Sequence, residues 1–133
     1  MRAGEVLDVA VREQSRAVTA RAGDAGDAGA AAVGLPVDTY ERLLDSVPTP
    51  VLRSFRERLL GPLAEYDAQH SAELLPTLRS FLACDGSWSA CASRMYVHVN
   101  TVRYRIGRVE AITGRDLSAL PDRVDFFLAL RGA

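Results

Sequence analysis

The sequence predicts an all-α fold, a small helical bundle built around a helix-turn-helix pair. First, apolar residues recur at intervals of three and four through most of the chain beyond residue 37, as in amphipathic helices. Second, residues 87–114, SWSACASRMYVHVNTVRYRIGRVEAITG, contain two such patterns separated by a short turn. Third, 133 residues with 48% hydrophobic and 25% charged side chains suit one soluble domain with a modest core.

The beginning of the chain carries the weakest signal. Residues 1–19 have only a thin apolar stripe, which predicts a helix with little apolar surface to pack. Residues 20–36 are almost entirely Ala, Gly and Asp, which offer little to bury and predict a flexible linker. We therefore expect three regions: this segment, 1–36, a helical extension, 37–72, and a helix-turn-helix domain, 73–133.

Local start and stop signals divide the extension into short helices. Asp38 and Glu41 have the spacing of an N-cap and its reciprocal partner, which predicts a helix start. Thr49, which precedes a proline, predicts a second start. Gly61 and Pro62 are expected to end or bend this second helix, with another turn or short helix opening at Pro62.

The helices before and after the pair are predicted from the same kinds of signal. Ser71 is expected to cap a helix that extends to about Cys84, with a start nearer Leu75 as the alternative because Pro76 lies in its early part. Gly86 supplies its stop. A last helix is expected to open at Pro121. Along one side of it we expect Val124, Phe127, Leu128 and Arg131, with Phe126 and Phe127 covering the back of the pair.

The pair itself has a capped first helix and a two-sided second helix. Ser87 is a suitable N-cap, and residues 96–98 make the turn, with Val97 buried between the helices. The second helix is expected over residues 99–113, closed by Gly114. The predicted buried stripes are Trp88, Cys91, Ala92 and Met95 on the first helix and Val102, Ile106, Val109 and Thr113 on the second.

The opposite side of the second helix carries polar and basic side chains. At 100° per residue it collects Asn100, Arg103, Tyr104, Gly107, Arg108 and Ala111, with Thr101 and Arg105 on the shoulders. A DNA recognition helix needs this division, because one face packs while the other presents donors to base edges and phosphates. Asn100 is suited to adenine and Arg103 to guanine. The amides near Ser87 and Ser89 are suited to a phosphate.

Simpler interpretations of the same residues stay open. The arginines of this face can equally form a solvated surface, as charged residues on helices usually do. His98 by itself is more often a cap or a turn residue than a base reader. Tyr104 has the alternative of packing against the preceding helix.

The charge is unevenly distributed, although the whole chain has a formal charge of only −1. Residues 1–86 carry nine arginines and thirteen acidic residues, and residues 116–133 carry two arginines and three aspartates. Residues 87–115 carry five arginines against Glu110 alone. All sixteen basic residues are Arg, so position rather than arginine content is informative. Positive charge is concentrated in the helix pair, where binding to a DNA duplex requires it. The acidic first half of the chain is expected to face away from the duplex.

Several other classes of function lack support. Residues 1–21 have no apolar core of a secretory signal, and no apolar run approaches the roughly 20 residues of a membrane span, so we expect a cytoplasmic protein with no membrane partner. Cys84 and Cys91 are expected to be buried free thiols. No nucleophile motif, P-loop, carboxylate pair or metal-ligand spacing is evident, so we expect neither an enzyme nor a cofactor or metal site.

The run FLACDGSWSACASRMYVHVNTVRYRIGRVEAITGRDLS, with LGPLAEYD and LLPTLRSFL before it and LALR after it, resembles a known family. It is similar to the C-terminal helix-turn-helix domain, of Fis-like type, of PucR/CdaR-type regulators of purine or sugar-diacid catabolism, over about residues 51–131. The resemblance implies a transcription factor. It also implies DNA contacts from the start of the second helix: His98, Asn100, Thr101, Arg103, Tyr104 and Arg105, to which we add Val99 and Arg108 as neighbours on that helix.

The sequence departs from the family in two respects. Val99 stands where family members often have a polar or basic residue, so one contact is expected to be missing. The upstream sensor and GGDEF-like region of such regulators have no room here, so we expect the effector end alone, without an inducer bound to this chain. We expect a sequence-specific regulator that binds double-stranded DNA as a homodimer. The alternative is a protein-interaction or dimerisation module that keeps the fold without productive DNA contacts.

Overall fold

A computed structural model describes residues 36–131, which contain six helices and no strand, so the all-α prediction is confirmed. The expectations for residues 1–19 and 20–35 lie outside the described residues. Contacts divide the chain into two units, residues 1–48 and 49–133. Among the described residues, no helix combines the length and the apolar character that a bilayer crossing requires.

Helix α3 (Tyr40–Asp45) belongs to the first unit, and its cap differs from the predicted one. The N-cap is Thr39, whose Oγ1 accepts a hydrogen bond from the Arg42 amide at 3.2 Å. Asp38 lies one residue earlier and approaches the Arg42 guanidinium at 4.0 Å. The prediction of Asp38 as cap was therefore wrong by one position, because both residue types cap well and spacing alone did not separate them.

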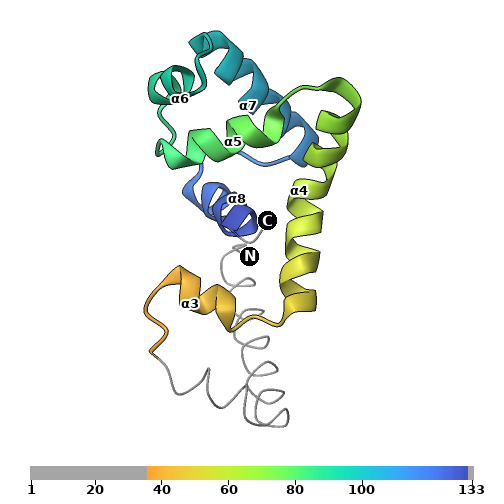
Figure 1. Ribbon diagram of the computed structural model, residues 1–133, viewed down its shortest axis with the longest axis vertical. Helices are drawn as coiled ribbons and strands as arrows, with labels where there is room; N and C mark the ends of the chain where they lie inside the picture. The colour runs from red at the N-terminus through yellow and green to blue at the C-terminus, as the bar shows by residue number, and fades with distance from the viewer. Residues whose placement is uncertain (1–35, 132–133) are drawn as a thin grey trace, which may run out of the picture. The chain divides into compact units, whose positions relative to one another are not determined.

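Helix α4 (Thr49–His70) opens the second unit at the predicted start but does not stop where predicted. It continues through Gly61 and Pro62 as one helix, so the predicted alternative of an end at this point was wrong (Figure 1). A proline inside a helix removes one backbone hydrogen bond and crowds the preceding turn. The leucines on both sides of it, Leu59, Leu60 and Leu63, are buried in the core. Tertiary packing therefore holds together a helix that local signals divide.

Helix α5 (Leu74–Ala83) begins at the later of the two starts that the sequence allows, and a residue of the preceding helix caps it. Ser71 and Glu73 both have positive φ angles, 50° and 56°, and neither side chain caps the helix. The amides of Leu74 and Leu75 instead donate to the two carboxylate oxygens of Asp67 at 2.8 and 2.9 Å. Gly86 closes the helix as predicted, with φ 77° and its amide bound to the Phe81 carbonyl at 2.9 Å.

Helices α6 (Trp88–Met95) and α7 (Val99–Thr113) form the predicted pair with the predicted bounds. Ser87 caps α6, because its Oγ accepts from the Ala90 amide at 3.2 Å. Gly114 ends α7 in the left-handed region, with φ 71°. The predicted stripes are fully buried at Cys91, Ala92, Val102, Ile106 and Val109, and half-buried at Trp88, Met95 and Thr113. Val97 in the turn is half-buried rather than fully buried.

Helix α8 (Leu120–Arg131) uses a different inner side from the one predicted. Its buried residues are Phe126, Ala129 and Leu130. Phe126 is therefore a core residue as expected, whereas Val124 is 41% exposed and Phe127 is only half-buried. The sequence could not decide the side, because apolar residues surround this helix and the direction of the core depends on where α4 and α5 lie.

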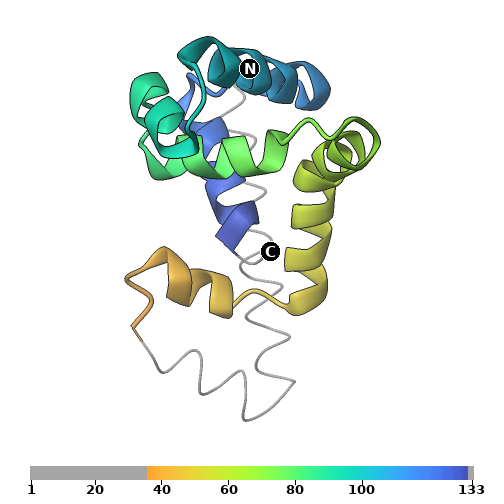
Figure 2. The same cartoon turned by 45° about the horizontal axis from the view of Figure 1, so that its top comes forward.

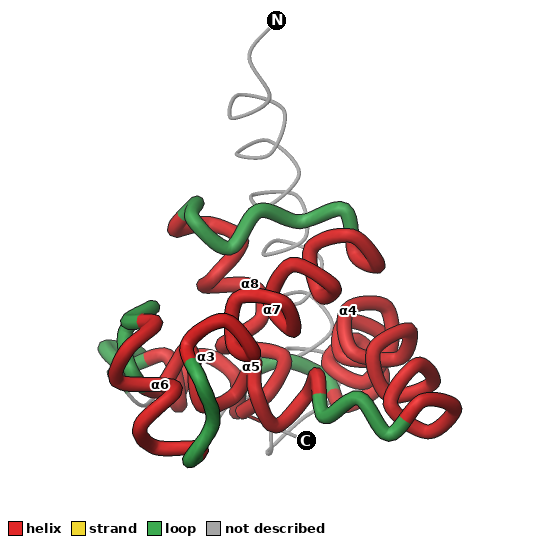
Figure 3. Tube along the Cα trace, turned by 90° about the horizontal axis from the view of Figure 1, so that it is seen from above, coloured by secondary structure: helices red, strands yellow, loops and turns green. Residues whose placement is uncertain are grey.

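One hydrophobic core joins the five helices of the second unit, α4 to α8, and α5 contacts the other four. Figure 3 shows α6 and α4 at opposite ends of the unit, with α5, α7 and α8 between them. In Figure 2, α7 lies along the upper edge with α5 beneath it. The buried leucines of α4 belong to the same core as the helix-turn-helix, and residues 49–133 form one unit. The core residues of the unit are Leu59, Leu60, Leu63, Leu74, Leu78, Phe81, Cys91, Ala92, Val102, Ile106, Val109, Leu117, Phe126, Ala129 and Leu130.

Candidate nucleic-acid interface

Helix α7 has one buried side and one exposed side, as its sequence predicts. Val102, Ile106 and Val109 are at most 1% exposed and face the core. The side chains of Asn100 and Arg103 are exposed, and Tyr104 is 68% exposed. Tyr104 therefore does not pack against the preceding helix. This exposed side, defined by Asn100, Arg103 and Tyr104, is called the α7 face below.

The start of α7 is fixed by His98 and Val99. His98 is the N-cap, and its Nδ1 accepts the Asn100 amide at 3.0 Å, which requires an unprotonated Nδ1. The cap uses the backbone of Asn100 and leaves its carboxamide in solvent. Val99 is half-buried against the core, so the apolar residue at this position anchors the first turn. Thr101 is also half-buried.

Arg103 lies on the aromatic ring of Trp88. Its guanidinium carbon is 5.3 Å from the ring centroid, within the range of a cation–π contact. Trp88 in turn packs against Phe81, with the ring centroids 4.7 Å apart. Arg103 makes no ion pair with any of residues 36–131. Within these residues no carboxylate occupies the N–H groups of the Arg103 guanidinium, so they stay available to bind a ligand.

Arg105 turns away from the α7 face toward α5. Its guanidinium lies 3.5 Å from the Glu73 carboxylate and donates to the Thr77 hydroxyl at 3.3 Å. The Arg105 side chain is only 18% exposed, and Thr77 is fully buried. Arg105 thus satisfies a buried hydroxyl and connects α7 to α5.

Arg108 turns toward α4 in a comparable way. Its guanidinium donates to the Tyr66 hydroxyl at 3.2 Å and lies 5.1 Å from the centre of the Tyr66 ring. Tyr66 stacks on His70, with ring centroids 4.2 Å apart. The Nε of Arg108 is buried and has no hydrogen-bond partner among the described residues. The helical projection places Arg108 on the outer side of α7, but its long side chain folds back against α4.

Ser87, before α6, and Ser89, within it, differ in whether their hydroxyls are free to bind a ligand. The Ser87 hydroxyl accepts the Ala90 amide as a cap, so one of its lone pairs is already used. Ser89 is exposed, and its hydroxyl lies 3.5 Å from that of Ser87. Both hydroxyls stand at the beginning of α6, where backbone amides and the helix dipole favour an anion.

Folding redistributes the positive charge that the sequence concentrates in residues 87–115. Arg115 binds Asp125 at 2.6 Å and Asp122 at 3.1 Å, and these hydrogen bonds raise the pKa of its guanidinium. Arg105 is paired with Glu73. Arg94 and Arg103 are the two arginines of the pair that are exposed and make no ion pair with described residues. Fewer arginines are therefore exposed and without an ion pair than the five that residues 87–115 contain, and those two are Arg94 and Arg103.

Sequence reasoning did not select Arg94 or Tyr96. Arg94 is exposed in the last turn of α6. Tyr96 is 95% exposed and has a left-handed backbone conformation, with φ 57°, in the turn that leads into α7. Arg94 was detectable, because it lies outside the apolar stripe of α6. The orientation of Tyr96 depends on its positive φ, which a tyrosine does not signal.

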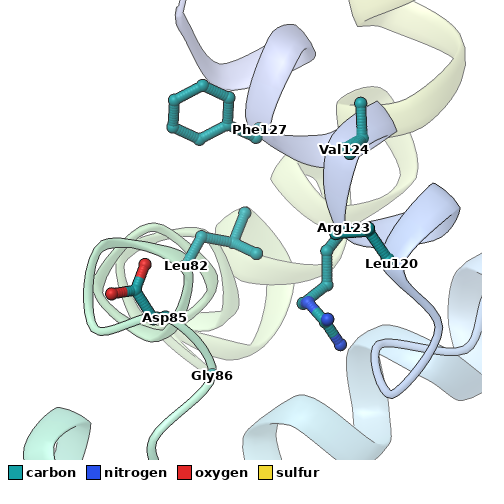
Figure 4. A pocket seen from close by; sticks show the side chains of 7 residues that line it. All are labelled: Leu82, Asp85, Gly86, Leu120, Arg123, Val124 and Phe127. Carbon is teal, nitrogen blue, oxygen red and sulfur yellow. The ribbon is translucent and has the colours of Figure 1, made fainter.

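A shallow hollow of about 350 Å³ lies elsewhere, between the end of α5 and α8 (Figure 4). None of the predicted site residues lines it. Its lining is Leu82, Asp85, Gly86, Leu120, Arg123, Val124 and Phe127. It contains no nucleophile with an adjacent base. Among the described residues, no group of three or more His, Cys, Asp or Glu side chains is placed to hold a metal ion.

Comparisons with known proteins identify one family that matches the helix-turn-helix part of the chain. Residues 74–132 match the family described as the PucR C-terminal helix-turn-helix domain. An uncharacterised protein in the pkwA 5' region of Thermomonospora curvata is 43% identical over 93 residues, covering 70% of this chain and 49% of that protein. The transcriptional activator PmfR of Paenarthrobacter nicotinovorans is 37% identical over 75 residues, covering 56% of this chain and 16% of that protein.

A third relative is the DNA-binding transcriptional activator AdeR of Bacillus subtilis. It is 28% identical over 72 residues, covering 54% of this chain and 17% of AdeR. The chain thus spans about half the length of the Thermomonospora relative and under a fifth of the two activators. No solved structure matches the sequence significantly.

Proposed function

Residues 74–132 are a helix-turn-helix domain of the PucR C-terminal type, and on this premise we propose that the protein is a sequence-specific transcriptional regulator that binds double-stranded DNA. One observation carries the proposal. Helix α7 is held to the core by Val102, Ile106 and Val109, while the α7 face presents an amide, a guanidinium and a phenol to solvent. A helix that reads DNA requires this combination of a fixed back and a polar front.

The dimensions of α7 suit the major groove. A helix with its side chains is about 10–12 Å in diameter, and the groove is about 12 Å wide. In the proposed complex Asn100 hydrogen bonds to adenine and Arg103 to guanine, since these pairings offer two hydrogen bonds each. Tyr104 and Thr101 contact the flanking phosphates. The small residues of the same side, Gly107 and Ala111, leave room for the DNA backbone.

The remaining predicted site residues receive different roles in this proposal. His98 and Val99 set the entry of α7 rather than reading bases. Ser87 and Ser89 place the beginning of α6 at a phosphate. Arg105 and Arg108 keep α7 attached to α5 and α4, and the exposed Arg94 is added as a phosphate contact. The same proposal places the protein in the cytoplasm as a regulator without a catalytic step.

Binding should be measured as a function of salt, because phosphate contacts release counterions. The slope of log K against log salt is about −0.9 for each phosphate neutralised, so the phosphate contact of Arg94 predicts about −1 per copy. The experiment is fluorescence anisotropy with a bulk genomic duplex and with duplexes selected from a random pool. Salt-dependent binding with enrichment of one sequence supports the proposal. No binding to either duplex at low salt would refute it.

The proposal includes two copies on one operator, since a single module buries little surface and operators are commonly two-fold. The alternative, a dimerisation module without DNA contacts, is favoured by one observation. Leu120 is 62% exposed and Val124 41% exposed beside the mostly apolar hollow of Figure 4. Sedimentation of the wild type and Val124→Glu tests whether this surface holds a second copy. A dimer that persists in a wild type without affinity for DNA would select the alternative.

A further inference from the structure

We propose that Trp88 is a positioning residue for DNA recognition, which holds the Arg103 guanidinium ready on the α7 face. The inference rests on the proposed function, because its effect is expressed as DNA affinity. It assigns a role to a side chain that the sequence identifies only as part of a buried stripe.

The position of the Trp88 ring is determined by the core. Trp88 is the first residue of α6 and is half-buried. Its ring packs on Phe81, which is 3% exposed, at 4.7 Å between centroids and 43° between ring planes. A ring supported in this way has little freedom to move. It therefore offers Arg103 a fixed surface between α6 and α7.

The contact restrains Arg103 without consuming its hydrogen bonds. The guanidinium carbon lies 5.3 Å from the Trp88 centroid, so the ring attracts the cation through its π face. The five N–H donors of a guanidinium lie in its plane, and a carboxylate would occupy two of them. A ring leaves them available for a base or phosphate. Arg105 shows the contrast, because the Glu73 carboxylate faces its guanidinium.

Restraint in the free protein should raise affinity. A free arginine side chain samples many rotamers, and part of this conformational entropy is lost when it binds. When the ring already limits the rotamers of Arg103, less entropy remains to be lost on the duplex. An exposed cation–π contact corresponds to about a two- to fivefold effect on an equilibrium.

The test is a double-mutant cycle with DNA affinity as the readout. Trp88→Leu removes the ring, Trp88→Phe keeps an aromatic surface, and Arg103→Ala removes the cation. We expect Trp88→Leu to weaken binding of the selected duplex about two- to fivefold, and Trp88→Phe to restore most of the loss. In the Arg103→Ala background, Trp88→Leu should cause no further loss. All measurements are made at a temperature where circular dichroism shows each variant folded.

A second measurement does not need DNA. In the free protein, ring currents of Trp88 should displace the NMR resonances of the Arg103 side chain, and Trp88→Leu should return them to ordinary values. If the wild type binds DNA but Trp88→Leu loses affinity equally with and without Arg103, the loss is structural and the positioning role is overturned. Unchanged affinity in Trp88→Leu overturns it as well. Failure of the wild type to bind any duplex removes the proposed function itself.

Discussion

The two sides of helix α7 use the same residue type for different purposes. On one side Arg103 lies in solvent on the ring of Trp88, with no carboxylate partner among residues 36–131. Arg105 and Arg108 instead turn toward α5 and α4, where Arg105 is paired with Glu73 and Arg108 bonds the Tyr66 hydroxyl. The helical repeat sets the direction in which each arginine leaves the helix. The neighbouring helix then decides whether that arginine is a ligand contact or a connection within the fold.

The largest effect should come from breaking the buried side of α7. Ile106 is 1% exposed, and Ile106→Ala should lower the free energy of unfolding by about 2–5 kcal/mol, through lost burial and a residual cavity. Urea denaturation measures the change. Tyr104→Ala on the exposed side is the matched control and should alter stability by no more than about 0.5 kcal/mol. Similar losses in both variants would contradict the division of α7 into two sides.

The next effect concerns the α7 face and DNA. Asn100→Ala should reduce affinity for the selected duplex by about 1–3 kcal/mol, because it removes a bidentate base contact. Binding to bulk duplex should change much less, since that binding depends on phosphates. Stability should be preserved, because His98 bonds the backbone and not the side chain of Asn100. An equal loss on both duplexes would exclude Asn100 as a base reader.

A smaller effect should follow from detaching α7 from α4. Arg108→Ala should lower the free energy of unfolding by about 1–2 kcal/mol, since it removes a hydrogen bond and a cation–π contact. Tyr66→Phe removes only the hydroxyl and should cost about 0.5–1.5 kcal/mol. Thermal and urea denaturation of both variants and of their combination gives the coupling energy. Stability that is unchanged in Arg108→Ala, together with lost DNA affinity, would move Arg108 to the DNA-contacting side.

The smallest effect is expected at Gly107 of α7, for which Gly114, the C-cap that follows the helix, is the comparison. Gly107 lies in the helix, and a Cβ placed there meets nothing within 4 Å. Gly107→Ala should therefore raise the free energy of unfolding by about 0.4–1 kcal/mol. Gly114 has φ 71°, where an L side chain is strained, so Gly114→Ala should lower stability by about 1 kcal/mol or more. Changes of the same sign at both positions would contradict this assignment of their conformations.

Local chemistry explains how much of the helix pair could be predicted. Ser87 and Gly114 are a cap and a stop whose effect reaches only a few residues, and both act where expected. The apolar spacing of Val102, Ile106 and Val109 likewise identified the buried side of α7. Each of these signals is contained within one helix. They required no knowledge of the neighbouring elements.

Apart from the cap of α3, which was wrong by one residue, the errors fall where a contact crosses between helices. The amides at the start of α5 are capped by Asp67, in the last turn of α4, and not by Ser71. Helix α4 continues through Pro62 because its leucines belong to the common core. The inner side of α8 is set by Phe126, Ala129 and Leu130, although other apolar residues surround it. Spacing along the chain contains no information about these partners.

The sequence by itself determined the helix pair, its caps and the polar character of the outer side of α7, because hydrogen bonds and periodicity within a few residues specify them. Only the tertiary structure decided which arginines of the pair stay free. That outcome depends on Glu73, Tyr66, Asp122 and Asp125 standing within reach after folding. A long, flexible cationic side chain takes whichever partner the packed helices bring near it, so its role is a property of the assembled fold.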